Sequence, residues 1–425
     1  MIRRLISLSI LAILLCFTAC NSDKAGDTNP LPKQVTDAPA ATENVEEVDE
    51  NNADKIVIIT NAVTSTGVND YFQDEFYSAQ LMVKKYPNRV IHEVWPDGEW
   101  NDLEKLESMK LVAERIATDT EIKACVINST IYGTNLVVDK LHETRNDILV
   151  IYCYSAEEPK ESAERADIIM LPNEVKIGFD IARLAYEAGA KTFVHYSFQF
   201  HLDRYTMLAA RFDILKAECE RLGMDFVYAE VPNPLVDRGG FQQQFMLVDV
   251  SRKVTQYGKN TAFFSTLCIT QSSLIEACIN EGAIYPSPCC PSPYHGYPAA
   301  LELDGFHQII SDNTNYTIID NPAQIVESEF RRTTIEQINQ KIVDANLCGH
   351  FSTWPFQSDI LNTYAAVDYA FKWIAGETNG KTDINVMREC LESYTGPGVD
   401  IEPYVENGVT YDNFFLYMQP YITFK

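Results

Sequence analysis

The sequence predicts an α/β protein with two doubly wound parallel-sheet lobes that are joined by a multi-strand hinge. From Lys55 onward, short apolar runs alternate with longer stretches of helical spacing. Apolar runs separated by helices are typical of parallel strands that are buried on both faces. The alternation begins again after Pro172, and residues 55–425 are too many for one compact core. The chain is therefore expected to form two lobes of similar build.

The first lobe is predicted from apolar runs that end before polar or turn-forming residues. The expected strands are residues 55–60, 90–95, 122–127, 148–154 and 167–171. The expected helices carry apolar residues three or four positions apart and span residues 71–86, 102–117 and 135–143. Pro172 cannot donate to a sheet ladder, so it should stop the last of these strands.

The second lobe is predicted from the same alternation. Its expected helices span residues 174–188, 204–221, 243–256 and 272–280, and a glycine follows each of them closely: Gly189, Gly223, Gly258 and Gly282. Its expected strands are residues 192–196, 226–231 and 261–267. Further along, residues 349–354 and 359–375 are expected to add one more strand and helix, and residues 411–424 to form a terminal aromatic strand pair.

The two lobes are expected to share the chain in four pieces. The hinge is placed near residues 172–173, 317–320 and 349–354. Residues 55–172 and 349–395 are assigned to the N-terminal lobe. Residues 173–348 and 396–425 are assigned to the C-terminal lobe.

The N-terminus has the pattern of a secretory signal peptide over residues 1–19. Arg3 and Arg4 precede an apolar run over residues 5–17, and small residues follow it up to Cys20. The pattern resembles a bacterial lipoprotein signal, which implies that Cys20 is lipidated and anchors the protein to the membrane outside the cytoplasm. A plain secreted protein and an N-terminal membrane anchor are the alternatives, although the apolar run is short for a span.

Residues 20–54 are expected to be a disordered acidic tether between the anchor and the folded part. Residues 21–54 hold nine acids and two lysines, and they show no apolar periodicity. Such a composition cannot bury enough surface to fold. The net charge is −26, of which −21 falls on residues 55–425, and this charge excludes nucleic acid as an expected partner.

Motifs for catalysis are not found, so the protein is not expected to be an enzyme and no cofactor is predicted. The chain has no Gly-x-Ser-x-Gly, no His-Glu-x-x-His and no glycine-rich phosphate loop. Nine cysteines follow Cys20, an odd number that leaves at least one outside any intramolecular disulfide. Cys125 and Cys153 lie within apolar runs and are expected to be small buried hydrophobes.

Three segments carry a resemblance to a known superfamily. Residues 174–196 (EVKIGFDIARLAYEAGAKTFVHY), residues 197–212 with Arg204 at the expected head of a helix, and residues 354–376 resemble type I periplasmic binding proteins. The resemblance covers residues 55–425 and implies that two lobes close over a small solute. Sugar-binding members usually carry Asn-Asp after the strand equivalent to residues 261–267, and this chain has no carboxylate there. The chain also resembles a family of predicted bacterial lipoproteins known mainly as a domain of unknown function.

The candidate ligand site follows from the predicted sheets. Ligands bind outside the carboxyl ends of strands in open parallel sheets, and in two lobes these ends face one cleft. The candidate ligand-binding residues therefore follow the strands: Asn61, Ser65, Thr66, Trp95, Asn128, Ser129, Thr130, Tyr154 and Ser155 in the first lobe, Ser197, Phe198, His201, Arg204, Thr266 and Gln271 in the second, and Trp354. Hydroxyl, amide and aromatic groups suit a neutral or zwitterionic molecule with a flat or ringed part.

Several of these residues also have structural interpretations. Asn61, Ser65, Asn128 and Ser129 could cap the helices that follow them. Trp95 could belong to the core, His201 could be an ordinary loop residue, and Arg204 could pair with Asp203 or Asp237 on the surface.

Residues 286–297 (PSPCCPSPYHGY) have an unusual composition with three interpretations. Cys289, Cys290 and His295 could bind a soft metal, although adjacent cysteines do not match the usual ligand spacing. The two cysteines could form a strained, redox-active disulfide. The third interpretation, a rigid proline-rich loop at the mouth of the cleft, is preferred, so no metal site is predicted.

The predicted function is a lipid-anchored solute receptor. The ligand is expected to be a nucleoside or another ring-bearing metabolite, then an amino acid or short peptide, then a sugar. The expected partner is a membrane permease with its ATPase, or a sensor. The alternatives are a ligand sensor without a transport role, and an extracytoplasmic redox protein or enzyme that uses Cys289 and Cys290.

Overall fold

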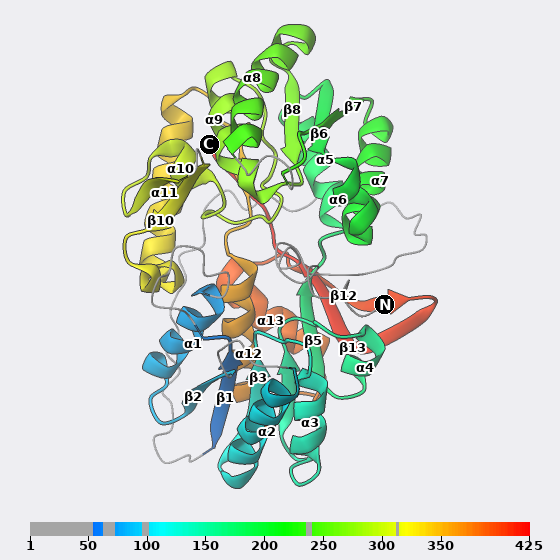
Figure 1. The fold of residues 1–425 in the computed structure, drawn as a ribbon, viewed down its shortest axis with the longest axis vertical. Helices are drawn as coiled ribbons and strands as arrows, with labels where there is room; N and C mark the ends of the chain where they lie inside the picture. Colours follow the sequence, from blue (N-terminus) through cyan, green and yellow to red (C-terminus); the bar gives the residue numbers. More distant parts are fainter. Residues whose placement is uncertain (1–53, 63–72, 96–101, 235–239, 312–313) are drawn as a thin grey trace, which may run out of the picture.

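The protein folds into two α/β lobes that lie one above the other along the longest axis (Figure 1). The computed structural model describes residues 54–62, 73–95, 102–234, 240–311 and 314–425. Each lobe contains a parallel sheet with helices on both faces, and the predicted fold class is confirmed. Within the described residues, no helix combines the length and apolar character that a bilayer crossing requires.

The N-terminal lobe is built on a seven-stranded sheet in the order β12-β13-β5-β4-β3-β1-β2. The strands are β1 (Lys55–Thr60), β2 (Val90–Val94), β3 (Ile122–Ile127), β4 (Leu149–Tyr152), β5 (Ile168–Pro172), β12 (Asp400–Glu406) and β13 (Val409–Met418). All neighbouring pairs are parallel except β12 with β13. The five-strand order β5-β4-β3-β1-β2 reverses between β1 and β3, which is the mark of a doubly wound sheet.

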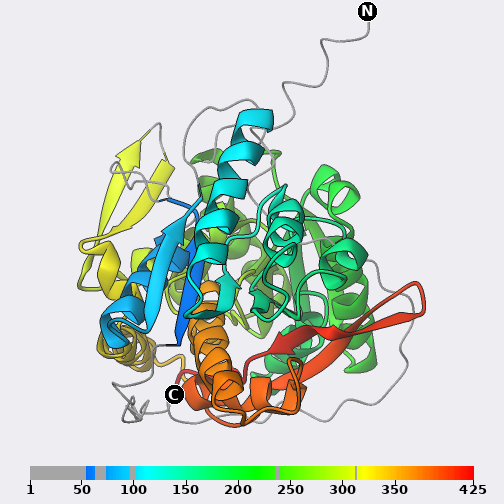
Figure 2. The same cartoon turned by 90° about the horizontal axis from the view of Figure 1, so that it is seen from below.

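Both faces of this sheet are covered because alternate strand residues point to opposite sides. Ile56 and Ile58 pack against α1 (Gln73–Lys85), α12 (Ser358–Ile374) and α13 (Ile384–Thr395). Val57 and Ile59 pack against α2 (Asp102–Thr118) and α3 (Thr134–His142). The short α4 (Pro159–Ala163) contacts β5 and β13. Figure 2 shows α2 (cyan) and the orange helices α12 and α13 on opposite sides of the sheet.

The C-terminal lobe has a smaller parallel sheet in the order β7-β6-β8. Its strands are β6 (Thr192–Ser197), β7 (Asp225–Glu230) and β8 (Thr261–Ser265). Single bridges extend the sheet from Ala262 to Ile284 and from Tyr285 to Phe351, and a two-residue ladder joins β11 (Ser352–Thr353) to β14 (Ile422–Thr423).

The helices of this lobe divide between two apolar clusters. One cluster includes residues of α8 (Gly240–Tyr257), α9 (Gln271–Glu281), α10 (Tyr297–Leu301) and α11 (Ser328–Asp344). The other includes residues of α5 (Ile177–Glu187) and α7 (Thr206–Arg221). A short helix, α6 (Gln199–Arg204), precedes α7 directly.

The assignment of residues 396–425 to the C-terminal lobe is wrong for most of that segment. β13 pairs with β5, so β12 and β13 extend the N-terminal sheet, and only β14 joins the C-terminal lobe. A second difference is the antiparallel pair of β9 (Phe306–Ser311) and β10 (Thr314–Ile319). β10 leads into a 3-10 turn, η2 (Pro322–Val326), whose Ile325 and Val326 pack in the core of the N-terminal lobe.

Between its two sheets the chain crosses at three places, and it also enters the core of the N-terminal lobe at η2, between α10 and α11. The first follows β5 at Pro172, where the sequence predicts it, and the backbone N–H of Asn173 donates to the Tyr417 carbonyl over 2.7 Å. The second lies between β11 and α12, and the third between β13 and β14. Because β5 ends at the first crossing and β6 returns toward it, the carboxyl ends of both parallel sheets face the junction between the lobes.

His195 is a buried histidine in the core of the C-terminal lobe, and it gives a testable pH effect. Its ring lies 4.9 Å from that of Phe212 and 5.5 Å from that of Phe264. Burial, with a smaller effect of the Arg211 charge, lowers the pKa of His195 to about 3. The folded state therefore resists protonation, and its stability should fall as the pH drops below the unfolded pKa of about 6.5.

Replacing His195 by Phe should remove this pH dependence. Between pH 7.5 and pH 5, the wild-type protein should lose about 2 kcal/mol of unfolding free energy through this residue, and H195F should not. Urea unfolding of both proteins at the two pH values gives the comparison. Equal losses in the two proteins would contradict the buried, neutral state of this imidazole.

Candidate functional site

Asn128 and Ser129 follow β3 at the junction between the lobes, and both are almost fully buried. The Asn128 amide nitrogen donates to the Asp359 carbonyl over 3.0 Å and to the Thr363 hydroxyl, so it reaches the first turn of α12. Within the described chain, the Asn128 Oδ1 and Ser129 Oγ atoms have no hydrogen-bond partner. A buried polar group without a partner costs about 1–3 kcal/mol, so such atoms are candidate ligand contacts.

Asn61 and Trp95 follow β1 and β2, and the structure gives them different surroundings. The Asn61 amide nitrogen is buried and has no hydrogen-bond partner among the described residues. Trp95 is packed in the core under α2 and donates its indole N–H to the Ser129 carbonyl over 2.7 Å. This placement favours the structural interpretation of Trp95, which supports the Ser129 backbone. Ser65, Thr66 and the predicted lipidation site Cys20 lie outside the described residues.

Thr130, Tyr154 and Ser155 are tied into local loop contacts. The Thr130 hydroxyl donates to the Tyr154 carbonyl over 3.0 Å and accepts from the Ala156 backbone N–H. The Ser155 hydroxyl donates to the Glu157 carbonyl over 3.1 Å and lies 3.0 Å from the Ser162 hydroxyl. These contacts join the loops after β3 and β4.

In the C-terminal lobe, Ser197, Thr266 and His201 are brought together after β6 and β8. The Ser197 and Thr266 hydroxyls lie 2.8 Å apart, and the His201 Nδ1 atom lies 3.2 Å from the Thr266 hydroxyl. Phe198 stacks on the His201 ring with a centroid distance of 5.1 Å and an angle of 13°. Burial, followed by the charge of Arg211, lowers the pKa of His201 to about 4, so the ring is neutral at pH 7.

Gln271 has a structural role in the described chain. Its amide nitrogen donates to the carbonyls of Ser265 and Leu267 over 3.1 and 2.9 Å, and its amide oxygen accepts from the Tyr285 hydroxyl. The side chain is fully buried and its hydrogen bonds are occupied by the protein. These bonds fix the start of α9 against the end of β8.

Arg204 is exposed, and it ends α6 where the sequence suggests the head of a long helix. Arg211, on α7, is a buried arginine near this site that sequence reasoning missed. Its guanidinium donates to the Cys289 carbonyl over 3.2 Å and lies 5.5 Å from the Phe264 ring. The sequence does hold a signal for Arg211. Its spacing from the apolar residues of α7 places this charged residue on the buried face of the helix.

Trp354 follows β11 at the second crossing between the lobes. Its ring is 5.9 Å from that of Tyr421, which belongs to the third crossing. Among the described residues, the Trp354 indole nitrogen and the hydroxyl of the preceding Thr353 are buried and have no hydrogen-bond partner. The hinge therefore presents the same kind of buried polar atom as the ends of β1 and β3.

Two buried carboxyl groups of the N-terminal lobe have raised pKa values. Burial, together with the charge of Cys290, raises the pKa of Asp359 to about 6. Burial and the nearby Asp359 charge raise the pKa of Asp74 to about 7. Both residues stand in the first turn of a helix, α12 and α1, and they bring negative charge toward the junction as the pH rises through this range.

The segment over residues 286–297 is an irregular loop, and most of it is buried. Hydrogen bonds from Cys268, Cys289 and His295 hold the pKa of Cys290 well below its usual range. Burial alone would lower the pKa of His295, but the hydrogen bond and charge of Cys290 raise it. Cys268 is the member that sequence reasoning missed, because it precedes Cys289 by 21 residues and reaches it only through the fold.

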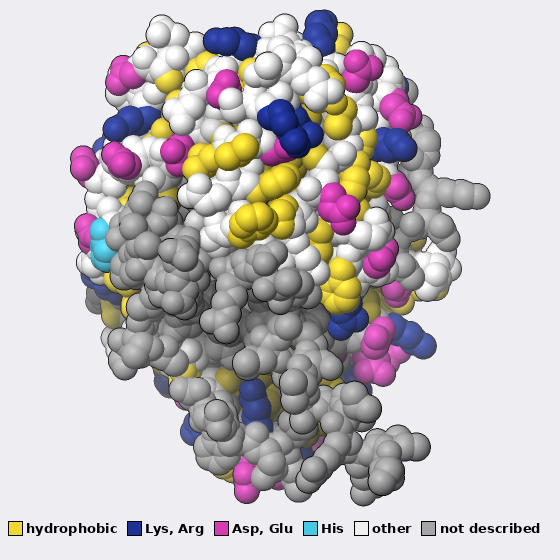
Figure 3. Space-filling view, turned by 45° about the horizontal axis from the view of Figure 1, so that its top comes forward, with side chains coloured by type: hydrophobic (Ala, Val, Ile, Leu, Met, Phe, Trp, Pro, Cys, Tyr) yellow, Lys and Arg dark blue, Asp and Glu magenta, His cyan; other side chains and the backbone are white. Residues whose placement is uncertain are grey.

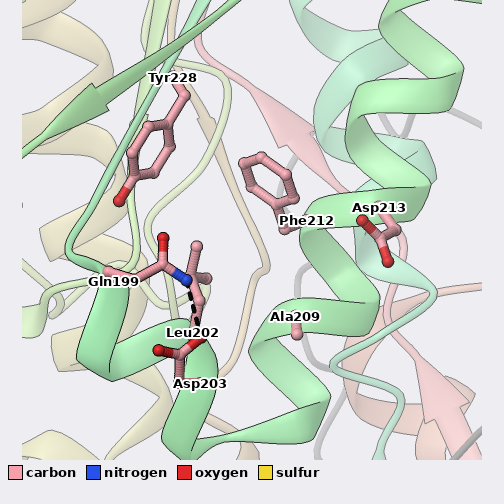
Figure 4. A pocket seen from close by; sticks show the side chains of 7 residues that line it. All are labelled: Gln199, Leu202, Asp203, Ala209, Phe212, Asp213 and Tyr228. Carbon is pink, nitrogen blue, oxygen red and sulfur yellow. Dashed lines mark hydrogen bonds between the residues drawn. The ribbon is translucent and has the colours of Figure 1, made fainter.

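A separate pocket with a volume of about 260 Å³ lies on α6, α7 and β7 (Figure 4). It is lined by Gln199, Leu202, Asp203, Ala209, Phe212, Asp213 and Tyr228. Gln199 donates across it to Asp203 over 2.7 Å. The volume is below the range of about 300–1,000 Å³ that is usual for small-molecule sites.

The described surface of the C-terminal lobe carries acidic and basic side chains that are interspersed, with apolar side chains among them (Figure 3). The largest exposed apolar side chains on α8 are Phe241 and Val248. This mixture gives no continuous basic surface for a polyanion on the face shown, in keeping with the net charge of −26.

Comparison with known proteins places the chain in a family. Residues 55–330 match the family described as "Protein of unknown function (DUF3798)". An uncharacterised protein of Treponema pallidum (strain Nichols) is 28% identical over 170 residues, which are 40% of this chain and 78% of that protein. A second uncharacterised protein of the same organism is 29% identical over 145 residues, covering 34% of this chain and 64% of that protein.

Among solved structures, a protein of Clostridium difficile 630, described provisionally as a transcriptional regulator, matches with a TM-score of 0.72. It is 19% identical, and the match covers 88% of this chain and 99% of that chain. A periplasmic solute-binding protein of an ABC transporter from Actinobacillus succinogenes 130z, with bound D-allose, matches with a TM-score of 0.41, 14% identity and coverage of 76% and 92%. The chain shares its fold with the Clostridium difficile protein, and it belongs to the DUF3798 family of proteins of unknown function.

Proposed function

We propose that the protein is an extracytoplasmic receptor that closes its two lobes over one small organic solute. The proposal rests on one observation. Several buried polar atoms at the lobe junction have no hydrogen-bond partner among the described residues. They are Asn61 Nδ2, Asn128 Oδ1, Ser129 Oγ, Thr353 Oγ1 and Trp354 Nε1. Both donors and acceptors occur in this set, and a solute with complementary groups would satisfy them.

The proposed mechanism is a hinge motion at the three crossings. The open form would expose the ends of β1, β3, β6 and β8 to solvent, and a solute would bring the two sets of loops together. Closure would replace water with fixed hydroxyl and amide groups, so the closed form gains stability only when the solute fits. The closed shape is then the signal that a partner would recognise.

The side chains at the junction favour a solute with a ring. Phe198 and His201 form a stacked pair on the C-terminal lobe, and His201 is neutral at pH 7. On the N-terminal side, the hydroxyl and amide groups of Asn128 and Ser129 accompany the carboxyls of Asp74 and Asp359. A nucleoside or another ring-bearing metabolite is therefore the first choice, followed by an amino acid or short peptide, and then by a sugar.

The proposed location and partners rest on the N-terminal sequence. A lipidated Cys20 and the acidic tether over residues 20–54 would hold the two lobes close to the outer face of the cell membrane. The partner would be a permease of the ABC type or a membrane sensor. A sensor without a transport role, or a redox protein that uses Cys289 and Cys290, is the alternative.

Replacing Ser129 by Ala tests the proposed site directly. The Ser129 hydroxyl is buried and has no partner among the described residues, so its loss should not lower the stability of the solute-free protein and should raise it where the hydroxyl is unsatisfied. Solute affinity should fall about 5-fold to 20-fold through the lost hydrogen bond. Thermal-shift screening with nucleosides, amino acids and sugars identifies the solute, and calorimetric titration measures the change in affinity.

Ser162→Ala is the matched control for this experiment. Ser162 is equally buried, but its hydroxyl lies 3.0 Å from that of Ser155 and accepts from the Asn135 amide over 3.4 Å. This variant should lose stability and keep its affinity for the solute. If S129A binds as tightly as the wild-type protein, or if S162A weakens binding equally, Ser129 is not part of the site.

A further inference from the structure

Three side chains that commonly bind metal ions converge beside the hinge. Cys268 lies in a 3-10 turn, η1 (Cys268–Thr270), just after β8, and Cys289 and His295 lie in the irregular segment before α10. Their donor atoms, two Sγ and one ring nitrogen, all lie within 4.8 Å of one another. Sequence spacing gave no reason to group Cys268 with the other two.

The distances between the sulfur atoms fit a shared metal ion. The Cys268 and Cys289 Sγ atoms are 3.5 Å apart, and the Cys289 and Cys290 Sγ atoms are 3.8 Å apart. Ligands on a tetrahedral centre with bonds of ~2.3 Å are separated by about 3.8 Å, whereas a disulfide bond is about 2.05 Å long. Both distances are compatible with ligands of one ion, and neither is a disulfide bond.

The orientation of His295 also suits a ligand. Its Nδ1 atom lies 2.9 Å from the Cys290 carbonyl oxygen, which can only accept, so Nδ1 carries the proton. In the neutral ring the Nε2 atom carries the lone pair that a metal ion needs, and binding of the ion displaces a proton held there. Metal-binding histidines commonly donate their other ring N–H to a backbone carbonyl in this way.

The loop that carries these residues is held in place by its neighbours. The Cys289 carbonyl accepts from Arg211 over 3.2 Å, and the Ser292 hydroxyl accepts from the Tyr294 N–H over 3.1 Å. Gly296 has a φ of 87°, and a Cβ atom there would lie 2.8 Å from the Gln271 Cβ atom. The glycine thus allows the loop to approach α9 closely, and a preformed set of donors results.

We propose that Cys268, Cys289 and His295 bind one thiophilic d10 cation, Zn²⁺ or Cu⁺, with the Cys290 thiolate as an additional donor. Thiolate and imidazole ligands favour these ions, whereas Mg²⁺ and Ca²⁺ require oxygen ligands. Binding displaces the thiol protons to solvent, and the ion joins the turn after β8 to the loop before α10. The proposed site differs from the sequence-based expectation of no metal site, and it does not depend on the proposed receptor function.

The proposal is tested by metal binding to the full-length protein, prepared without metal in detergent and a non-thiol reductant. Zn²⁺ is titrated in competition with a chromophoric chelator, and Cu⁺ in competition with a Cu⁺-specific chelator. We expect one ion per chain for at least one of the two metals. Cys268→Ser and His295→Gln should each weaken binding by about 100-fold or more.

Cys348→Ser is the matched control, because Cys348 is exposed and lies apart from the cluster. It should bind the ion as the wild-type protein does. Co²⁺ in place of Zn²⁺ should give intense near-ultraviolet absorption from thiolate ligands in the wild-type protein and in C348S, and a weaker band in C268S. Circular dichroism of each variant shows that it is folded.

Three outcomes would overturn the proposal. The first is the absence of one-to-one binding of either ion to the folded, reduced wild-type protein. The second is equal weakening by C268S and C348S, which would indicate adventitious binding. The third is unchanged binding in both C268S and H295Q. Solute binding is measured separately, so a failure of the receptor function leaves the metal result interpretable, and the reverse also holds.

Discussion

Replacing Trp354 by Ala is expected to lower the free energy of unfolding by about 3–5 kcal/mol. Trp354 is 1% exposed and packs with Tyr421 and Met418, so it joins the second crossing between the lobes to the third. Loss of the indole would leave a cavity in this cluster that backbone segments from both lobes cannot easily fill. Urea denaturation followed by tryptophan and tyrosine fluorescence measures the change.

Trp354→Phe separates packing from hydrogen bonding at the same position. An aromatic ring remains, so the loss of stability should be much smaller than for W354A. The indole N–H is absent, so solute affinity should fall about 10-fold if this group donates to the solute. A loss below about 1 kcal/mol for W354A would contradict the packed hinge. Unchanged affinity in W354F would remove Trp354 from the site.

Replacing Glu218 by Leu should also lower the free energy of unfolding by about 3–5 kcal/mol. The Glu218 carboxylate accepts from Arg183 over 2.9 Å and from Arg221 over 2.7 Å. The Arg183 and Glu218 side chains are only 7% and 3% exposed. Hydrogen bonds from Arg221 and Arg183 hold the pKa of Glu218 below its usual range, so the pair is ionised at neutral pH. The single substitution therefore leaves a buried guanidinium without its main counter-charge.

The double variant R183M/E218L tests this explanation. Replacing both charges with apolar groups should recover most of the stability that E218L loses, because no buried charge is then left uncompensated. Glu220→Leu, on the exposed side of the same helix, should change stability by no more than about 0.5 kcal/mol. If the double variant is no more stable than E218L, the loss arises from packing on α7 and not from the isolated charge.

The central part of the fold could be predicted from the sequence because its strands are buried on both faces. The runs at residues 55–60 and 122–127 match β1 and β3 without any shift, since their apolar character ends sharply at polar residues. α11 was missed, although Arg331, Thr334, Ile335, Ile338 and Ile342 follow a helical period on its buried side. That pattern was readable in the sequence.

The partners of the late strands could not be predicted in the same way. β12 and β13 have ordinary strand patterns, but the pairing of β13 with β5 depends on contacts between residues more than 200 positions apart. Local pattern indicates that a segment is a strand and does not indicate which sheet it joins. Their assignment to the C-terminal lobe was wrong for this reason.

The candidate site was predicted in outline because strand ends in parallel sheets gather at one edge. Asn128 and Ser129 are placed there with unpartnered atoms among the described residues, and Ser197, Thr266 and His201 are brought together on the other lobe. The roles of the side chains were less predictable. The Gln271 side chain, for example, makes its hydrogen bonds to Ser265, Leu267 and Tyr285 within the protein. Cys268 contacts Cys289 only because the fold brings the turn after β8 next to the proline-rich loop.

Native mass spectrometry of the purified protein, before and after mild denaturation, tests the receptor function most directly. We expect a discrete additional mass, in the range of a nucleoside or a similar small metabolite, that is bound to the folded chain and is released on unfolding. The Ser129→Ala protein should carry less of it. A folded protein that holds no organic solute, and that gains none from a metabolite library at millimolar concentration, would contradict the proposal of a solute receptor.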